Sequence, residues 1–424
     1  MSGLKLAIIG AGSGYTSELI EEISKQEQIL EIKEVVLHDI DENRLNIMAD
    51  YCLRNLKAQG SSIKIKRTRN LTEAIDGAHF IDTQIRVGGN RQRVLDEKIP
   101  LKYGFLGQET TGIGGMFKAF RTIPAMLEIA RKVEEINPDA WIVNYTNPTG
   151  LVTEALLKKS KIKIAGLCSG GLFPKWWAKK ALGVDEMDVD YDYVGLNHMN
   201  FAFNLKIKGR PVSDLELDKI IEASNHGEVD ITLMKKLRLI PSPYLKYFFH
   251  RSKIIEELKA KKTTRGEYVL EIEKEVFRAF SNPYQVTIPE ILHQRGGGGY
   301  SEVAINVMKA IHTDKTQKIV VNVPNNGVIK WLPDDAVIET PCLVNASGIK
   351  PLAVPELPKE IWGLISAVKN YEQLAVEAAL TGSLDLAELA LLAHPLIGDY
   401  ERIKPLLNEM MAANKEFLPQ FKYH

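Results

Sequence analysis

A glycine-rich turn lies near the start of the chain, where residues 10–15 read GAGSGY. It follows a short apolar segment, residues 4–10, that predicts a buried strand, and it precedes residues 16–24, whose pattern predicts a helix. Glycines in such a turn let backbone N–H groups approach a pyrophosphate at the positive end of the helix dipole. We therefore expect a dinucleotide to be bound by Gly10, Gly12, Ser13, Tyr15 and Thr16.

An acid follows at the place where a ribose would be bound. Asp39 closes the second predicted strand, residues 35–40, and an acid there binds ribose hydroxyls. Because a carboxylate repels a 2′-phosphate, Asp39 favours NAD over NADP. The pattern is imperfect, since Tyr15 replaces the usual third glycine and the spacing to Asp39 exceeds the usual ~20 residues. A glycine turn with a purely structural role is the alternative.

Three further residues could do chemistry if the fold brings them together. Cys168 ends a predicted strand, His198 lies in GLNHMN, and Tyr244 lies in PSPYLKY. A cysteine and a histidine alone are a weak metal signal, because a thiolate is a soft ligand. On residue type alone, Cys168 and His198 are more typical of a protein core, and Tyr244 fits aromatic packing equally well.

Two polar segments accompany the predicted strands. Residues 144–150, NYTNPTG, follow a strand end, where open α/β sheets bind ligands. Residues 103–115, YGFLGQETTGIGG, combine five glycines with Gln, Glu and three hydroxyl groups. This composition is poor for a core, so we expect a loop that wraps a polar ligand.

The elements that must position these residues alternate in the first half of the chain. Strands and helices alternate through residues 1–170, which predicts a parallel, doubly wound sheet. The second half is mixed, with β-like segments at residues 193–208 and 319–323. Helical patterns cover residues 233–261, 268–280, 301–311 and 362–380, and two more helices follow. The predicted fold class is α/β, a Rossmann-type NAD-binding domain (residues 1–195) joined to a mixed α+β, helix-rich domain (residues 196–424), as in lactate and malate dehydrogenases.

Composition excludes several classes of function. The 424 residues include 54 Lys plus Arg and 54 Asp plus Glu, so the formal net charge is zero. This argues against nucleic acid or an anionic membrane as a partner. No apolar run approaches the ~20 residues of a membrane span, and the chain opens in a strand, without a signal peptide. The three cysteines fit a reducing compartment, and together these features predict a cytoplasmic enzyme.

Several long motifs in order make the chain resemble family 4 of the glycoside hydrolases, the NAD- and metal-dependent glycosidases. They cover the chain nearly end to end: GxGSxYT at residues 10–16, DID at 39–41, IPLKYGFLGQETTGIGG at 99–115, TNP at 146–148, GLC at 166–168, GLNH at 195–198, PYLKY at 243–247, and RGG with YS at 295–301. The GQETTG form is most similar to the 6-phospho-β-glucosidase branch.

The resemblance implies a redox route to hydrolysis. NAD takes a hydride from C3 of the sugar, which acidifies the proton on C2. A base removes that proton, the aglycone leaves by elimination, water adds, and the hydride returns. By resemblance, Tyr244 is the base, and Cys168 and His198 hold a divalent metal at O2 and O3, with Mn²⁺ expected. A free tyrosine has a pKa of ~10, so Tyr244 would need a nearby cation.

The resemblance also implies a phosphorylated glycoside as substrate and glucose 6-phosphate as product. Guanidinium groups suit phosphate, and the candidates for binding it are Arg86, Arg91, Arg93, Arg265 and Arg295. Glu109 is expected to line the sugar site. Asn147 would bind a sugar hydroxyl or only cap the helix that opens at Thr149.

Ser169 departs from the family pattern. The chain reads CSGG from Cys168, whereas the β-glucosidase branch carries CNVP and the α-glucosidase branch CDMP. Because Ser169 is expected near the C2 and C3 hydroxyls, a 6-phospho-α-glucosidase or an α-galactosidase is the alternative within the family. From other classes, a plain NAD-dependent sugar or hydroxy-acid dehydrogenase stays open, although no His–Asp pair suits its proton relay, as does an inactive NAD-binding sensor. The resemblance implies a homodimer or homotetramer.

Overall fold

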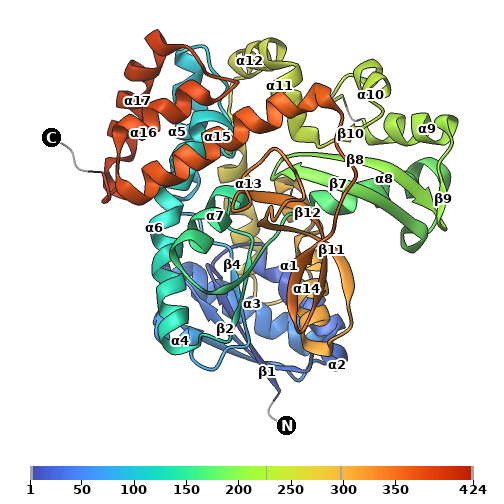
Figure 1. Ribbon diagram of the computed structural model, residues 1–424. Helices are drawn as coiled ribbons and strands as arrows, with labels where there is room; N and C mark the ends of the chain where they lie inside the picture. The colour runs from blue at the N-terminus through green and yellow to red at the C-terminus, as the bar shows by residue number, and fades with distance from the viewer. Residues whose placement is uncertain (1–2, 226, 297, 422–424) are drawn as a thin grey trace.

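The computed structural model describes residues 3–421 except positions 226 and 297. Within these residues, one sheet of 13 strands runs through the molecule, and helices lie on both of its faces (Figure 1). None of the helices in the described part of the chain is long and apolar enough to cross a membrane.

The N-terminal half of the sheet is parallel. Its strands are β1 (Leu4–Ile9), β2 (Ile32–His38), β3 (Lys64–Thr68), β4 (Phe80–Thr83), β5 (Trp141–Asn144) and β6 (Lys163–Gly166). They are hydrogen-bonded in the order β3-β2-β1-β4-β5-β6, and every neighbouring pair is parallel. This order confirms the predicted doubly wound sheet, and it opens a crevice at the carboxyl ends of β1 and β4.

Helices cover both faces because the buried strands send alternate side chains into two cores. Phe80 and Ile81, neighbours on β4, belong to opposite cores. The helices of one face are α4 (Leu71–Ile75), α6 (Gly112–Ile136) and α7 (Thr149–Lys159). Those of the other face are α1 (Thr16–Lys25), α2 (Glu27–Leu30), α3 (Glu42–Ala58) and α14 (Tyr300–Thr313).

An antiparallel half continues the same sheet beyond β6. Its strands are β7 (Val189–Leu196), β8 (Met199–Ile207), β9 (Arg210–Pro211), β10 (Ile240–Pro241), β11 (Gln317–Pro324), β12 (Val337–Asn345) and β13 (Gly348–Pro351). β11 joins β6 where Asn322 pairs with Gly166, so the sheet is continuous. The division into residues 1–195 and 196–424 stays a prediction.

The remaining helices belong mostly to the second half of the chain. They are α5 (Gly89–Lys102), α8 (Phe173–Leu182), α9 (Asp214–Ser224), α10 (Ile231–Leu237), α11 (Lys246–Phe249), α12 (Arg251–Ala260), α13 (Arg265–Phe280), α15 (Lys359–Thr381), α16 (Leu384–Ala393) and α17 (Tyr400–Asn414). Figure 1 shows α15, α16 and α17 (orange to red) beside α5 and α6, and α15 packs on α6 and α7. The predicted helix-rich C-terminal part is confirmed.

Two predicted segments were wrong in detail. Residues 103–115 are not one loop, because α6 begins at Gly112. Residues 233–261 are not one helical stretch, because β10 and a 3-10 turn, η3 (Pro243–Leu245), interrupt them. Prolines at 241 and 243 explain the break, since proline lacks the N–H that a continuing helix needs.

Candidate functional site

The glycine turn between β1 and α1 has the predicted form. Gly10 adopts a φ of 91°, a left-handed conformation that favours glycine. A Cβ on Gly12 would lie 2.7 Å from Asp39 Oδ2, so the turn and the acid approach each other only because Gly12 has no side chain. The Gly12 N–H donates to Asp39 Oδ2 at 2.7 Å, and the Asp41 N–H donates to Oδ1 at 2.9 Å. Each carboxylate oxygen keeps a lone pair for a further donor.

The other predicted cofactor residues hold the turn together. Thr16 is buried, donates to Ala11 O at 2.9 Å and accepts from Gln84 Nε2 at 2.6 Å. The Ser13 hydroxyl accepts from the Tyr15 N–H at 3.3 Å. The Tyr15 hydroxyl donates to Gly296 O at 2.8 Å. Tyr15 therefore ties the turn to the segment that precedes α14.

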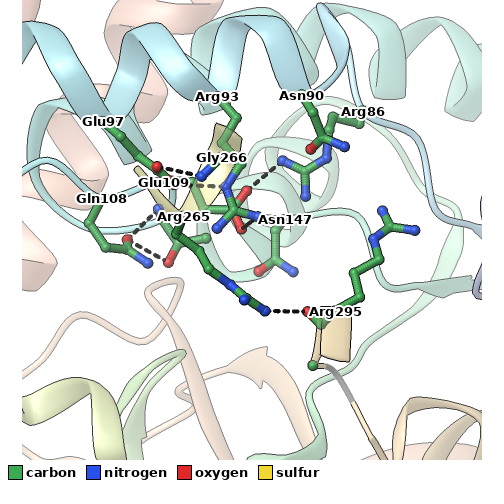
Figure 2. Close-up of polar contacts among 12 residues, drawn as sticks. Arg86, Asn90, Arg93, Glu97, Gln108, Glu109, Asn147, Arg265, Gly266 and Arg295 are labelled. Atoms are coloured by element: carbon green, nitrogen blue, oxygen red, sulfur yellow. Dashed lines mark hydrogen bonds and ion pairs between the residues drawn. The ribbon is translucent and has the colours of Figure 1, made fainter. Parts of the chain in front are cut away.

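A cluster of cations surrounds Glu109 (Figure 2). Its carboxylate oxygens lie 2.5 Å from Arg86 Nη1, 2.8 Å from Lys118 Nζ and 2.9 Å from Arg93 Nη1. Burial alone would raise the pKa of Glu109, but the charges of Arg86, Lys118 and Arg93 hold it well below its usual range. Burial, followed by the charge of Arg86, lowers the pKa of Lys118 to about 7.

Unlike Arg86 and Arg93, the nearby Arg295 makes no close ion pair in the described part of the chain. Arg295 is 9% exposed at its side chain, and its nearest carboxylate is Glu273 at 4.0 Å. Its guanidinium lies 4.5 Å from the centre of the Tyr15 ring and makes no hydrogen bond within the described residues. Five donors beside the glycine turn are thus available to an anion.

Two other candidate arginines are placed differently. Arg265 donates to the carbonyl of Gln294 at 2.9 Å and to that of Arg295 at 3.0 Å, and Figure 2 shows the second contact. Arg265 therefore holds the segment before α14. Arg91 is exposed, whereas Arg93 is drawn inward by Glu97 at 2.8 Å as well as by Glu109. The structure thus brings Arg86, Arg93 and Arg295 toward one region and leaves Arg91 outside it.

Strand pairing brings His198 and Tyr244 together, and Cys168 lies near enough to Tyr244 to affect its pKa. β7 and β8 form a hairpin whose two-residue turn ends at His198. β10 pairs antiparallel with β8, which carries Tyr244, three residues farther on, back to the hairpin. The rings of His198 and Tyr244 stack with centroids 3.8 Å apart and planes 6° from parallel. Burial, and then the neighbouring Cys168, raises the pKa of Tyr244.

The donor set of Cys168 and His198 fits a divalent metal that takes its remaining ligands from substrate. Burial lowers the pKa of His198 to about 4, so its ring is neutral and can act as a ligand at pH 7. Burial raises the pKa of the Cys168 thiol, and a coordinated thiol loses its proton outright. No group of three or more His, Cys, Asp or Glu in the described residues could hold a metal by itself. Two protein ligands leave positions open, as catalytic metal sites require.

Asn147 and Ser169 lie at the same edge of the sheet. The Asn147 side chain donates to Tyr145 O at 3.4 Å, and its Oδ1 is buried without a hydrogen-bond partner. It does not cap α7, which has no side-chain cap, so that alternative is wrong. This amide oxygen is therefore free to accept a hydrogen bond from a ligand. Ser169 is buried and begins a 3-10 turn, η1 (Ser169–Leu172), directly after Cys168.

Sequence reasoning missed two polar residues of this region. Lys118 lies in the otherwise apolar segment GGMFKAF on α6, and a lone charge there was a signal that it needed a buried partner. Thr110 contacts His198 Nδ1 at 3.1 Å. Its type and position gave no signal, because the contact crosses from the segment before α6 to the β7–β8 hairpin.

Comparisons with known proteins show which family the chain matches. The family model "Family 4 glycosyl hydrolase" matches residues 5–176, and the model of the same family's C-terminal domain matches residues 193–397. The probable 6-phospho-beta-glucosidase of Bacillus subtilis strain 168 is 41% identical over 99% of this chain and 98% of its own.

Solved structures extend the comparison to the fold. The 6-phospho-beta glucosidase of Thermotoga maritima, solved with manganese, NAD⁺ and glucose-6-phosphate, has a TM-score of 0.90 and 35% identity over 98% of this chain and 99% of its own. Malate dehydrogenase from Plasmodium falciparum, at 15% identity and a TM-score of 0.56, covers 90% of this chain and 99% of its own. The second likeness concerns the fold alone, and it confirms the predicted malate dehydrogenase-like architecture.

Proposed function

The chain belongs to family 4 of the glycosyl hydrolases and is a glycosidase, and we propose that it hydrolyses 6-phospho-β-glucosides to glucose 6-phosphate and the aglycone. The observation that carries the proposal is that two clusters of side chains, one around His198 and Tyr244 and one around Glu109, lie at the same edge of the sheet. The stacked His198–Tyr244 pair next to Cys168 suits metal-assisted proton abstraction. The cations around Glu109, with Arg295, suit a sugar phosphate.

The cofactor is NAD, which the Thermotoga maritima relative contains. When bound, NAD would accept a hydride from C3 of the sugar and later return it. The turn that contains Gly10, Gly12 and Ser13 would let the pyrophosphate approach the N-terminus of α1. Tyr15 and Thr16 would hold the turn in shape, and the free lone pairs of Asp39 would accept from ribose hydroxyls.

A divalent metal, Mn²⁺ in that relative, would be held by Cys168 and His198. When bound, the metal would supply a Lewis acid that stabilises negative charge on O2 and O3 of the sugar. Tyr244 Oη would remove the C2 proton. Because burial raises the pKa of Tyr244, it can act as a phenolate near neutral pH only beside a positive charge. Its ring stacks on His198, a proposed metal ligand, so a bound metal would supply that charge nearby.

The sugar phosphate would be bound mainly by Arg295, whose donors are free, and by the outer donors of Arg86 and Arg93. Arg265 would act indirectly, by holding the Gln294–Arg295 backbone. Asn147 Oδ1 would accept from a sugar hydroxyl. Glu109 would orient the cations. Ser169 would face the C2 and C3 hydroxyls, and because it replaces the asparagine of the β-glucosidase branch, a different anomer or sugar is the second candidate.

The test is turnover of nitrophenyl 6-phospho-glycosides in the α and β, gluco and galacto forms, with NAD, Mn²⁺ and a reductant. We expect the β-gluco substrate to be preferred, activity to be lost with a chelator, and no NADH to accumulate. Deuterium at C2 or C3 should slow turnover. Stoichiometric NADH would instead identify a plain dehydrogenase, and activity without NAD or metal would refute the mechanism.

We also propose that the protein forms a homo-oligomer and is located in the cytoplasm. Apolar side chains on and after α16 are exposed, with Leu389 at 50%, Leu392 at 43% and Tyr400 at 59%, and they support a homodimer or homotetramer, to be checked by light scattering after size exclusion. A cytoplasmic location is proposed because a reducing compartment keeps the Cys168 thiol available to a metal.

A further inference from the structure

A chain of three polar groups leads to the ring of His198. The side-chain oxygen of Gln108, Oε1, lies 2.5 Å from the backbone nitrogen of Thr110 and 2.9 Å from its hydroxyl, and Figure 2 shows both contacts of Gln108. The same hydroxyl lies 3.1 Å from His198 Nδ1. Gln108 and Thr110 belong to the segment before α6, and His198 belongs to the β7–β8 turn.

The backbone N–H of Thr110 determines the direction of each hydrogen bond from Gln108 to His198. A backbone N–H can only donate, so the Gln108 atom facing the Thr110 nitrogen must be the amide oxygen, which carries no hydrogen. The contact between that oxygen and the Thr110 hydroxyl therefore uses the hydroxyl proton. With its proton committed, the hydroxyl can only accept from the ring, so Nδ1 must carry the hydrogen.

We propose that Thr110 is a positioning residue that holds His198 as the Nδ1–H tautomer and so directs the lone pair of Nε2 to the metal. The inference rests on the metal role proposed above. In known metal sites, the second ring nitrogen of a ligating histidine is usually fixed in this way by a protein acceptor.

Two glycines keep Thr110 and Gln108 in place. A Cβ on Gly115 would lie 2.5 Å from the carbonyl carbon of Thr110, and a Cβ on Gly114 would lie 2.2 Å from the carbonyl oxygen of Gln108. The first turn of α6 therefore packs directly on the backbone of these two residues. Gly114 and Gly115 serve this close approach, and the polar side chains ahead of them act on His198.

The ring of His198 is restrained on other sides as well. Its backbone adopts a φ of 65°, a left-handed conformation that residues with a side chain rarely adopt. Its face is stacked on Tyr244 at 3.8 Å. With the backbone and the ring plane set, the tautomer is the remaining variable, and the hydrogen bond to Thr110 decides it.

The test compares Mn²⁺ binding by full-length, metal-free variants, followed by the electron paramagnetic resonance signal of free Mn²⁺. Thr110→Val keeps the side-chain shape and removes the acceptor, and we expect about 10- to 100-fold weaker binding. Thr110→Ser restores the hydroxyl and should restore affinity. Thr111→Val is the matched control, because the Thr111 hydroxyl makes no hydrogen bond within the described residues.

Two further measurements separate positioning from a general loss of structure. Gln108→Met frees the Thr110 hydroxyl to donate to the ring, so it too should weaken Mn²⁺ binding. Nitrogen-15 NMR of labelled histidines in the metal-free protein, assigned with His198→Asn, should show Nδ1–H at His198 in the wild type and lose that preference in Thr110→Val.

The outcomes distinguish this inference from the proposed function. Thr110→Val binding Mn²⁺ as tightly as Thr111→Val, or a wild-type Nε2–H tautomer, would overturn the role of Thr110 and leave the glycosidase proposal untouched. A wild-type protein that turns over substrate but binds no Mn²⁺ would overturn the metal role and this inference with it.

Discussion

A buried carboxyl on β4 makes a sharp prediction about stability. Asp82 is 1% exposed, and neither of its oxygens has a hydrogen-bond partner in the described structure. Burial raises the pKa of Asp82 from 3.8 to about 8. The folded protein therefore keeps this group protonated at pH values where the unfolded chain has lost the proton.

The sign and size of the effect follow from proton linkage. Because the folded state holds the proton between pH 4 and 8, Asp82 makes the free energy of unfolding fall by about 1.4 kcal/mol per pH unit as pH rises through this window. Between pH 5.5 and 7.5 the loss is about 2.7 kcal/mol. For 424 residues, an unfolding entropy of about 0.9 kcal/mol/K converts this loss to about 3 °C in Tm.

Asp82→Asn removes the ionisation and keeps the size of the side chain. We measure Tm by differential scanning fluorimetry and compare the Tm of Asp82→Asn with that of the wild type. The difference, variant minus wild type, should increase by about 3 °C from pH 5.5 to pH 7.5. Asp139→Asn, at a side chain that is 96% exposed, is the control and should run parallel to the wild type. A Tm difference between Asp82→Asn and the wild type that stays constant with pH would refute the reasoning.

Three other substitutions test the proposed site. Tyr244→Phe should lower kcat by about 10²- to 10⁴-fold, the usual contribution of a general base, while NAD and Mn²⁺ still bind in calorimetry. Arg295→Ala should raise KM for a 6-phospho-β-glucoside by tenfold or more, because a charged hydrogen bond contributes about 1.5–3 kcal/mol; an unchanged KM would remove Arg295 from the phosphate site. Glu109→Gln should lower Tm and strengthen binding of inorganic phosphate in calorimetry, since Arg86 and Lys118 lose their internal anion; weaker phosphate binding would contradict this.

The parallel strands other than β3 were predictable because they are short and largely apolar, as residues 4–9 show. Helix α5 was not predictable from its pattern, because its buried positions include Asn90, Asp96 and Glu97. Asp96 is paired with Arg121, 25 residues away on α6, and this partner explains how a carboxylate can be buried there. β12 escaped prediction for a similar reason, since Glu339 and Thr340 are fully buried within it.

The site was predictable as a set of residues but not as an arrangement. His198 and Tyr244 are 46 positions apart in the sequence, and only the two-residue strand β10 brings them together. A pairing of that length leaves no periodic signal. The resemblance of motifs identified these residues but not which of them are in contact. The contact of Thr110 with His198 became visible only in the tertiary structure.

The zero net charge of the chain conceals a local imbalance. Arg86, Arg93 and Lys118 bring three cations to the carboxylate of Glu109, with Arg93 shared with Glu97. Arg295 adds a fourth cation, whose nearest carboxylate in the described structure, Glu273, is 4.0 Å away. Burial and the charge of Arg86 lower the pKa of Lys118 to about 7, so this lysine is partly neutral in the free protein at pH 7. A phosphate dianion bound beside Arg86 and Arg295 would offset that repulsion and raise the pKa of Lys118. Substrate binding would then be accompanied by uptake of a proton. In this way a chain of zero net charge would bind an anion without any broad basic surface.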